Sequence, residues 1–210
     1  MKRILLVDDH EVVRIGLKHV IAETLPAVTW GETGNPPEAL ELAAQQEWDL
    51  IILELALQGN RGLELLKEMR AARPKVPVLV VTAHAEREYA MRAIKAGAAG
   101  FVTKSSSSTE LAKATKKVMS GGRYVSTSLA EALSADLLRK GPEFIHELLS
   151  DREFQVLRMI GSGKTVGEIA TLLAISDKTV STYRARILDK TGLKNNAEVV
   201  RYVVEHGLVD

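Results

Sequence analysis

The first half of the chain predicts an α/β fold, a doubly wound parallel sheet of about five strands. Four apolar runs, at residues 4–7, 50–53, 78–81 and 100–103, have the length of strands. They lack the alternation of apolar and polar residues that marks a sheet with one solvent-exposed face. A short run at residues 28–30 supplies a further strand. Segments with helical spacing separate these runs, so a strand and then a helix recur five times, as in a doubly wound sheet.

The intervening helices are predicted from their end signals and their apolar faces. Asn35 is an N-cap with Glu38 three positions later, and Ser107 with Glu110 repeats that spacing. Gly97 follows another helical segment as a stop signal. The apolar faces comprise Val13, Leu17, Val20 and Ile21, then Ala39, Leu40, Leu42 and Ala43, then Leu63, Leu66 and Met69, then Tyr89, Ala90, Ala93 and Ile94.

Chemically active side chains follow the apolar strands. Asp8 and Asp9 follow the first strand, Glu54 the next apolar run, Thr82 the next and Lys104 the last. Parallel strands present their carboxyl ends at one edge of the sheet, where α/β proteins bind ligands. Carboxylates suit Mg²⁺, and an ammonium with a hydroxyl suits a phosphoryl group. The sequence therefore predicts one pocket with both capacities.

Length and composition agree with a two-domain globular protein. The chain has 210 residues, and 46% of them are hydrophobic. It has no Cys, which excludes disulfides and Cys-ligated metals and fits the cytoplasm. No apolar run approaches the roughly 18 residues of a membrane span, and the start lacks the pattern of a signal peptide. We therefore expect a cytoplasmic protein without a membrane partner.

The C-terminal part changes to an all-α pattern. Residues 123–146 predict a partly helical linker, with a further helix of the first domain as the alternative. From residue 147 onward, Ser150, Thr165 and Ser176 each begin a helix, and a fourth helix covers residues 197–204. The tight turn before Ser176 is typical of a helix-turn-helix unit.

Positive charge gathers on the third of these helices. Residues 176–194 carry five cations and two anions, a local charge of +3. Such a local concentration of positive charge is expected of a helix that lies against phosphates, although many cationic helices merely face solvent.

A motif that resembles a phosphate-binding P-loop is rejected. Gly163, Lys164 and Thr165 match its end, but the glycine required five residues before Gly163 is replaced by Arg158. We interpret these glycines as a helix end and turn.

Residues 1–122 resemble the flavodoxin-like receiver domain of a bacterial two-component response regulator. The resemblance rests on the strand-end residues in order and on the stretch at residues 96–104, AGAAGFVTK. It implies that Mg²⁺ is the cofactor, and that the residue at position 54 accepts the phosphoryl group. By the same resemblance, Thr82, Phe101 and Lys104 sense the phosphoryl group, and the metal ligands are Asp8, Asp9, Glu54 and the carbonyl of Ala56.

Glu54 is the departure from that family pattern, which has Asp at this position. The extra methylene carries the carboxylate outward and misaligns it for in-line transfer, which can cost orders of magnitude in rate. It also moves the oxygens toward the place of a phosphoryl group, although with one charge instead of nearly two. A natural receiver that has given up phosphorylation and an introduced Asp→Glu replacement both remain open.

Residues 147–210 resemble the LuxR-type DNA-binding domain. The matching motifs begin at Ser150, Glu168, Ser176, Lys178 and Lys190. The resemblance implies that the third helix enters the major groove of double-stranded DNA. The residues it places near bases or phosphates are Lys178, Thr179, Ser181, Thr182, Arg184, Ala185 and Arg186.

Together the two resemblances indicate a NarL/FixJ-type response regulator. They imply a transcriptional regulator that is not an enzyme, whose receiver controls homodimerisation and DNA binding, with a histidine kinase as partner if Glu54 permits one. One alternative is a Mg²⁺-dependent phosphohydrolase of the haloacid dehalogenase kind. That chemistry needs aspartates two positions apart, and Asp8 would pair with His10. Another alternative is a receiver module whose C-terminal domain binds protein.

Overall fold

The computed structural model describes the chain except for residues 26, 58–60, 84–86, 139–141, 143 and 209–210. It divides into two compact units, Met1–Asp136 and Leu137–Asp210. None of the described helices combines the length and apolar character needed to cross a membrane. Part of the predicted linker, residues 139–141 and 143, falls outside the described residues.

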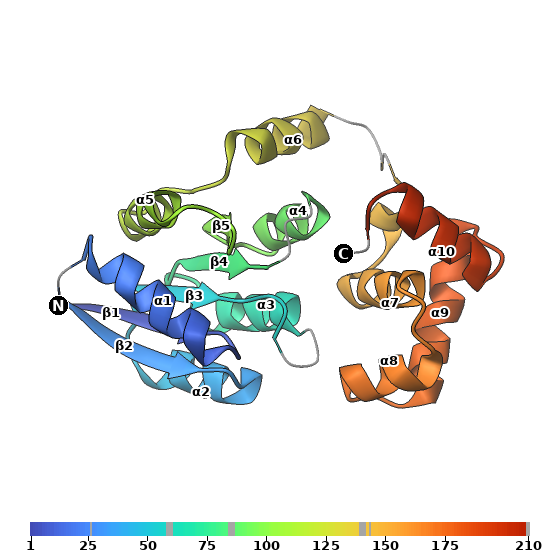
Figure 1. The fold of residues 1–210 in the computed structure, drawn as a ribbon, viewed down its shortest axis with the longest axis horizontal. Helices are drawn as coiled ribbons and strands as arrows, with labels where there is room; N and C mark the ends of the chain where they lie inside the picture. The colour runs from blue at the N-terminus through green and yellow to red at the C-terminus, as the bar shows by residue number, and fades with distance from the viewer. Residues whose placement is uncertain (26, 58–60, 84–86, 139–141, 143, 209–210) are drawn as a thin grey trace. The chain divides into compact units, whose positions relative to one another are not determined.

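A five-stranded parallel sheet forms the centre of the first unit (Figure 1). Its strands pair in the order β2-β1-β3-β4-β5, so the chain changes direction of winding at β1. Every described pairing is parallel, which brings all the carboxyl ends to one edge. The strands are β1 Lys2–Val7, β2 Val28–Thr33, β3 Leu50–Leu53, β4 Val78–Thr82 and β5 Gly100–Thr103.

Helices cover both faces of this sheet. Helix α1 packs beside α5, whereas α2 packs beside α3 and α3 beside α4. The strands β3 and β4 are buried along their whole length, which explains why their sequences are continuously apolar. The helices are α1 Glu11–Ala22, α2 Pro36–Gln45, α3 Gly62–Ala72, α4 Arg87–Lys95, α5 Ser108–Met119 and α6 Thr127–Leu138.

One apolar core lies between the sheet and the α1–α5 layer. Alternate residues of β1, β3 and β4 meet side chains of α1 and α5 there, as the period of two along a strand requires. The largest of these side chains are fully buried and fix the strand ends that carry the polar residues. The members are Ile4, Leu6, Leu17, Ile21, Leu50, Ile52, Leu79, Val81, Val102, Leu111, Ala114 and Val118.

The second unit is helical. Ser150 and Thr165 each form a reciprocal capping box at the start of their helices, as their spacing to Glu153 and Glu168 predicts. Ala174, at φ 52°, forms the left-handed turn that joins two helices in a helix-turn-helix pair. The elements are the 3₁₀ helix η2 Ile145–Leu148, α7 Asp151–Gly161, α8 Val166–Leu173, α9 Asp177–Thr191 and α10 Asn196–Glu205.

The predicted fold class is confirmed in both halves of the chain. The predicted boundaries at residues 122 and 147 remain predictions. The structure adds that α6 occupies much of the predicted linker, and that the division between the units falls within this helix.

Candidate functional site

The carboxyl ends of four strands bring together the side chains that the sequence singled out. Asp8 follows β1, Glu54 follows β3, Thr82 ends β4 and Lys104 follows β5. Because the strand order places β1, β3, β4 and β5 next to one another, these residues meet at one edge of the sheet. Asp8, Glu54 and Thr82 are each no more than 2% exposed. The base of the pocket is therefore shielded from bulk water.

The Glu54 carboxylate is held by four donors. Its Oε1 accepts the Thr82 hydroxyl and the Ala56 N–H, the latter at 2.8 Å. Its Oε2 accepts the Ala83 N–H at 3.3 Å and lies 2.6 Å from Lys104 Nζ. Two donors on each oxygen match the acceptor capacity of a carboxylate. The side chain is thereby held in one orientation, directed at Thr82 and Lys104.

Lys104 is the cation that joins the acidic groups. Its Nζ lies 2.6 Å from both Asp8 Oδ2 and Glu54 Oε2. Burial by itself raises the pKa of Glu54, but the bonds from the Ala56 amide, Lys104 and Thr82 outweigh it and hold that pKa below its ordinary value. Burial likewise lowers the pKa of Lys104, and its bonds to Asp8 and Glu54 reverse the direction, so that this pKa is raised.

These two shifts predict how the stability of the first unit depends on pH. The lowered pKa of Glu54 stabilises the fold above the ordinary value of 4.5, and this contribution is lost as pH falls through the folded pKa. The raised pKa of Lys104 stabilises the fold below 10.5 and is lost as pH rises through the folded pKa. Urea unfolding at several pH values should show both contributions undiminished between about pH 5 and pH 10, the range bounded by the ordinary pKa values. In Glu54→Gln the free energy of unfolding should fall less as the pH is lowered below about 5. An equal fall in this variant would contradict the attribution of the acid-side loss to Glu54.

A candidate metal site lies beside this ion pair. Among the described residues, Asp8, Asp9 and His10 bring their ligand atoms within 4.8 Å of one another. The His10 Nδ1 is 2.9 Å from Asp9 Oδ1, and its backbone N–H donates to Asp8 Oδ1 at 2.9 Å. The Lys104 ammonium pairs with two carboxylates, those of Asp8 and Glu54, so negative charge remains for a divalent cation to neutralise. The carboxylates of Asp8 and Asp9 therefore fit Mg²⁺.

The metal site expected from the sequence also included Glu54 and the carbonyl of Ala56. Both oxygens of Glu54 are engaged by hydrogen-bond donors, and Glu54 lies outside the group formed by Asp8, Asp9 and His10. Ala56 donates its N–H to Glu54. The predicted ligand set, which includes Glu54 and the carbonyl of Ala56, therefore stays a prediction. His10 was not expected in the site, and its position directly after the two aspartates was the available signal.

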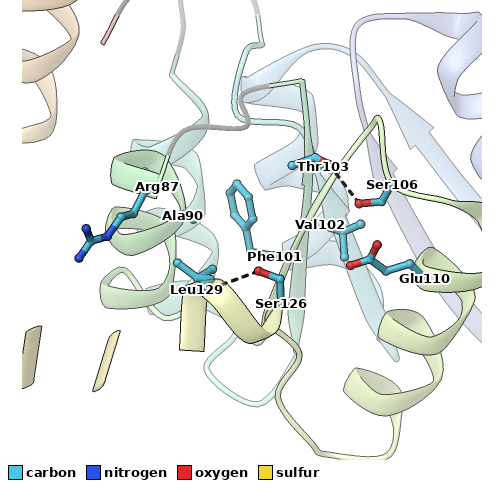
Figure 2. A pocket seen from close by; sticks show the side chains of 9 residues that line it. All are labelled: Arg87, Ala90, Phe101, Val102, Thr103, Ser106, Glu110, Ser126 and Leu129. Carbon is cyan, nitrogen blue, oxygen red and sulfur yellow. Dashed lines mark hydrogen bonds between the residues drawn. The ribbon is translucent and has the colours of Figure 1, made fainter. Parts of the chain in front are cut away.

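Phe101 lies on β5 and is 6% exposed. Figure 2 shows its ring beside Leu129, with Arg87 and Ala90 of α4 on the same side. These residues line a cavity of about 450 Å³ that also reaches α5. The predicted switch aromatic is therefore buried, beside the first turn of α6.

The predicted DNA-contacting residues lie on helix α9 (Figure 1). Val180 and Ile187 are fully buried and hold this helix against the rest of the second unit. The opposite face follows a helical spacing of three and four residues and is exposed to solvent. Its exposed members from the predicted set are Lys178, Ser181, Thr182, Ala185 and Arg186.

Two predicted members of the set are engaged within the unit itself. Arg184 Nε donates to Asn196 Oδ1 at 2.6 Å, which ties α9 to the start of α10. The Thr179 hydroxyl lies 2.8 Å from Ser176 Oγ, at the helix cap. Lys190, counted in the local charge, lies 2.7 Å from the buried Glu153. The positive charge of the exposed face is thus smaller than the sequence count of +3 indicates.

Comparison with protein families assigns both parts of the chain. Residues 4–116 match the response regulator receiver domain, and residues 147–203 match the luxR family of bacterial regulatory proteins. The chain belongs to the two-component response regulators. The predicted NarL/FixJ type, a receiver followed by a LuxR-type domain, is confirmed.

Curated response regulators resemble the chain over its full length. Response regulator GacA of Pseudomonas viridiflava is 33% identical over 213 residues, covering 100% of this chain and 99% of that protein. Response regulator UvrY of Escherichia coli K12 is 30% identical over 209 residues, covering 99% and 96%.

Solved structures share the fold. A LuxR-family response regulator from Aurantimonas is 33% identical, with a TM-score of 0.59, covering 65% of this chain and 98% of that one. The RcsB response regulator of Salmonella typhimurium has a TM-score of 0.72 at 24% identity, covering 98% and 99%. At that identity, the RcsB likeness concerns the fold alone.

Proposed function

We propose that this response regulator controls transcription by binding double-stranded DNA through helix α9. The observation that carries the proposal is the exposed face of α9, where Lys178 and Arg186 flank short side chains that allow close approach. Phosphate contacts by the cations would position the helix, and Ser181, Thr182 and Ala185 would face base edges. RcsB of Salmonella, which shares the fold, is described bound to promoter rprA.

We propose further that Glu54 keeps the receiver in the arrangement that a phosphoryl group would otherwise impose. Thr82 and Lys104 are the residues that the family resemblance assigns to phosphoryl sensing, and both bind the Glu54 carboxylate. Phe101 is buried at the same time. These contacts support a regulator that needs no phosphoryl donor, and a histidine kinase would then be dispensable as a partner.

In this proposal the chain acts by binding rather than by catalysis. It would work in the bacterial cytoplasm as a homodimer, because LuxR-type helices read two half-sites about one helical turn apart. A symmetric dimer presents two copies of α9, and the spacing of the half-sites reports that symmetry.

Selection of duplexes from a random DNA pool tests the proposal and reveals the target sequence in the same experiment. The unmodified full chain is used, with no phosphoryl donor added. We expect enrichment of a sequence with two half-sites about 10 bp apart, bound with an affinity that falls steeply with salt. If no duplex is enriched, and the amount of DNA that the protein retains does not depend on salt concentration, DNA binding is rejected.

Mg²⁺ should stabilise the fold because it would bind only the native pocket. We propose that Asp8 and Asp9 hold the ion, with His10 at its edge. At about ten times its dissociation constant, Mg²⁺ should raise the Tm by roughly 3–6 °C. Asp9→Ala should remove most of this shift in a thermal melt. Asp49→Asn, which alters a carboxylate paired with Lys2 before β3, should retain the shift; an equal shift in Asp9→Ala would place the metal elsewhere.

A further inference from the structure

We propose that Phe101 and residues 124–129 form a mechanical link between the Glu54 pocket and helix α6. Release of Thr82 from Glu54 would then loosen the start of α6 from the receiver. This inference rests on the proposed role of Glu54 as the resident partner of Thr82. It adds a defined route by which the state of the pocket reaches the chain segment that leads into the second unit.

The first part of the link is a backbone attachment at the edge of the sheet. The Phe101 N–H donates to the Tyr124 carbonyl at 3.0 Å, and the Tyr124 N–H donates to the Ala99 carbonyl at 3.0 Å. Tyr124 thereby forms a parallel bridge with Gly100, outside the named strands. Phe101, the predicted switch aromatic, is therefore hydrogen-bonded through its backbone to the segment just before α6.

Gly100 is required for this attachment. A Cβ atom at residue 100 would lie 3.0 Å from the Tyr124 carbonyl oxygen and 2.9 Å from Leu79 Cδ1. Any larger residue would push the Tyr124 segment away or displace the Leu79 side chain from its place in the core. The Tyr124 hydroxyl also donates to Glu110 of α5 at 3.3 Å, so the segment is held by its side chain as well.

The second part of the link is an apolar contact at the first turn of α6. Ser126 Oγ accepts the Leu129 N–H at 3.3 Å and so caps the helix. Leu129 is 7% exposed and, with Phe101, lines the cavity of about 450 Å³ between α4, β5 and α5 (Figure 2). Because the cavity leaves part of the Phe101 surroundings unfilled, the ring has space to change position without repacking the sheet core.

The third part of the link connects Phe101 to the pocket. In the β4–β5 register Val80 pairs with Phe101 and Thr82 pairs with Thr103. Residues two apart on a strand share a face, so Thr82 and Phe101 lie on the same face of the sheet as diagonal neighbours. The Lys104 N–H also donates to the Thr82 carbonyl at 2.7 Å. A movement of Thr82 therefore displaces neighbours on β5, the strand to which Tyr124 is hydrogen-bonded, and on the sheet face where the Phe101 ring lies.

Hydrogen exchange of the full chain, followed by mass spectrometry, tests the link in α6 directly. Leu129→Ala should raise the exchange rate of amides in residues 127–134 by more than about tenfold, because the helix loses its buried anchor. Glu131→Ala, an exposed position on the same helix, should leave that rate unchanged. Equal protection in Leu129→Ala and the unmodified chain would overturn the anchor.

The coupling to the pocket is tested by variants at Thr82. Thr82→Val removes the hydroxyl that binds Glu54 while nearly keeping the side-chain volume, and it should raise exchange in residues 127–134. Thr82→Ser keeps the hydroxyl and should behave as the unmodified chain does. Unchanged amide exchange in β1 and β3 verifies that each variant is folded. If the folded Thr82→Val variant shows no change in the exchange rate of residues 127–134, the proposal is overturned.

A double-variant comparison separates coupling from general loosening. Glu54→Ala should increase exchange in α6 when residue 101 is Phe, and should add nothing further in Phe101→Leu. The same increase in both backgrounds would contradict a route through the ring. If Glu54→Ala changes DNA affinity but leaves α6 unaltered, the link is rejected while the proposed role of Glu54 stands.

Discussion

Replacing Lys178 or Arg186 by Ala is expected to weaken DNA binding severalfold and to lower the salt slope by about one unit for each side chain. Both residues are exposed on α9, and Lys178 lies in its first turn, where the backbone amides also favour a phosphate. Specific and non-specific duplexes should lose affinity alike, because phosphate contacts carry no sequence information. Fluorescence anisotropy at several salt concentrations measures both quantities.

Two controls make that result specific to α9. Lys116→Ala removes an exposed cation of α5 and should leave the affinity and the salt slope unchanged. Thr182→Ala should alter sequence preference more than salt slope, since its side chain carries no charge. If Lys178→Ala and Arg186→Ala both retain full affinity and slope, α9 is not the helix on the DNA.

Acetyl phosphate with Mg²⁺ is expected to leave the unmodified chain without a phosphoryl adduct. The Glu54 carboxylate is longer than the family's Asp by one methylene, and four donors hold it in a fixed orientation. Misplacement of a nucleophile by about 1 Å can cost on the order of 100-fold in rate. Intact-mass analysis after incubation would detect an adduct.

Glu54→Asp is the matched control for this prediction. It places at position 54 the Asp that the family resemblance expects, with the rest of the pocket unchanged, so it should gain the mass of one phosphoryl group under the same conditions. Lys104→Ala in that background should reduce the gain, because the ammonium would no longer neutralise the incoming oxygens. A stable adduct on Glu54 itself would contradict the argument from geometry.

The first unit was predictable because its signals are local and repeat. Continuous apolar runs identified the buried strands, and the parallel order then required Asp8, Glu54, Thr82 and Lys104 to meet. The helical ends were equally legible: Ser150 and its partner three residues later predicted a capping box, which the structure contains. These signals depend on neighbours within a few residues, so a single sequence contains them.

The pairing of long side chains was not predictable in the same way. Lys190 counted as DNA-facing charge, but it reaches Glu153, 37 residues earlier in the chain. Arg184 reaches Asn196 across a helix junction. Similarly, the Glu54 carboxylate accepts the backbone N–H groups of Ala56 and Ala83, two hydrogen bonds that the sequence did not predict. Such choices depend on side-chain geometry between distant segments, which periodicity does not encode.

We propose that Glu54 substitutes for a phosphorylated acceptor. A comparison of the DNA affinity of the unmodified chain with that of Glu54→Asp, with and without a beryllofluoride phosphoryl mimic, decides this. We expect the unmodified chain without additive to bind as tightly as Glu54→Asp with beryllofluoride, and more tightly than Glu54→Asp alone. If the unmodified chain binds no better than Glu54→Asp without beryllofluoride, the claim is contradicted.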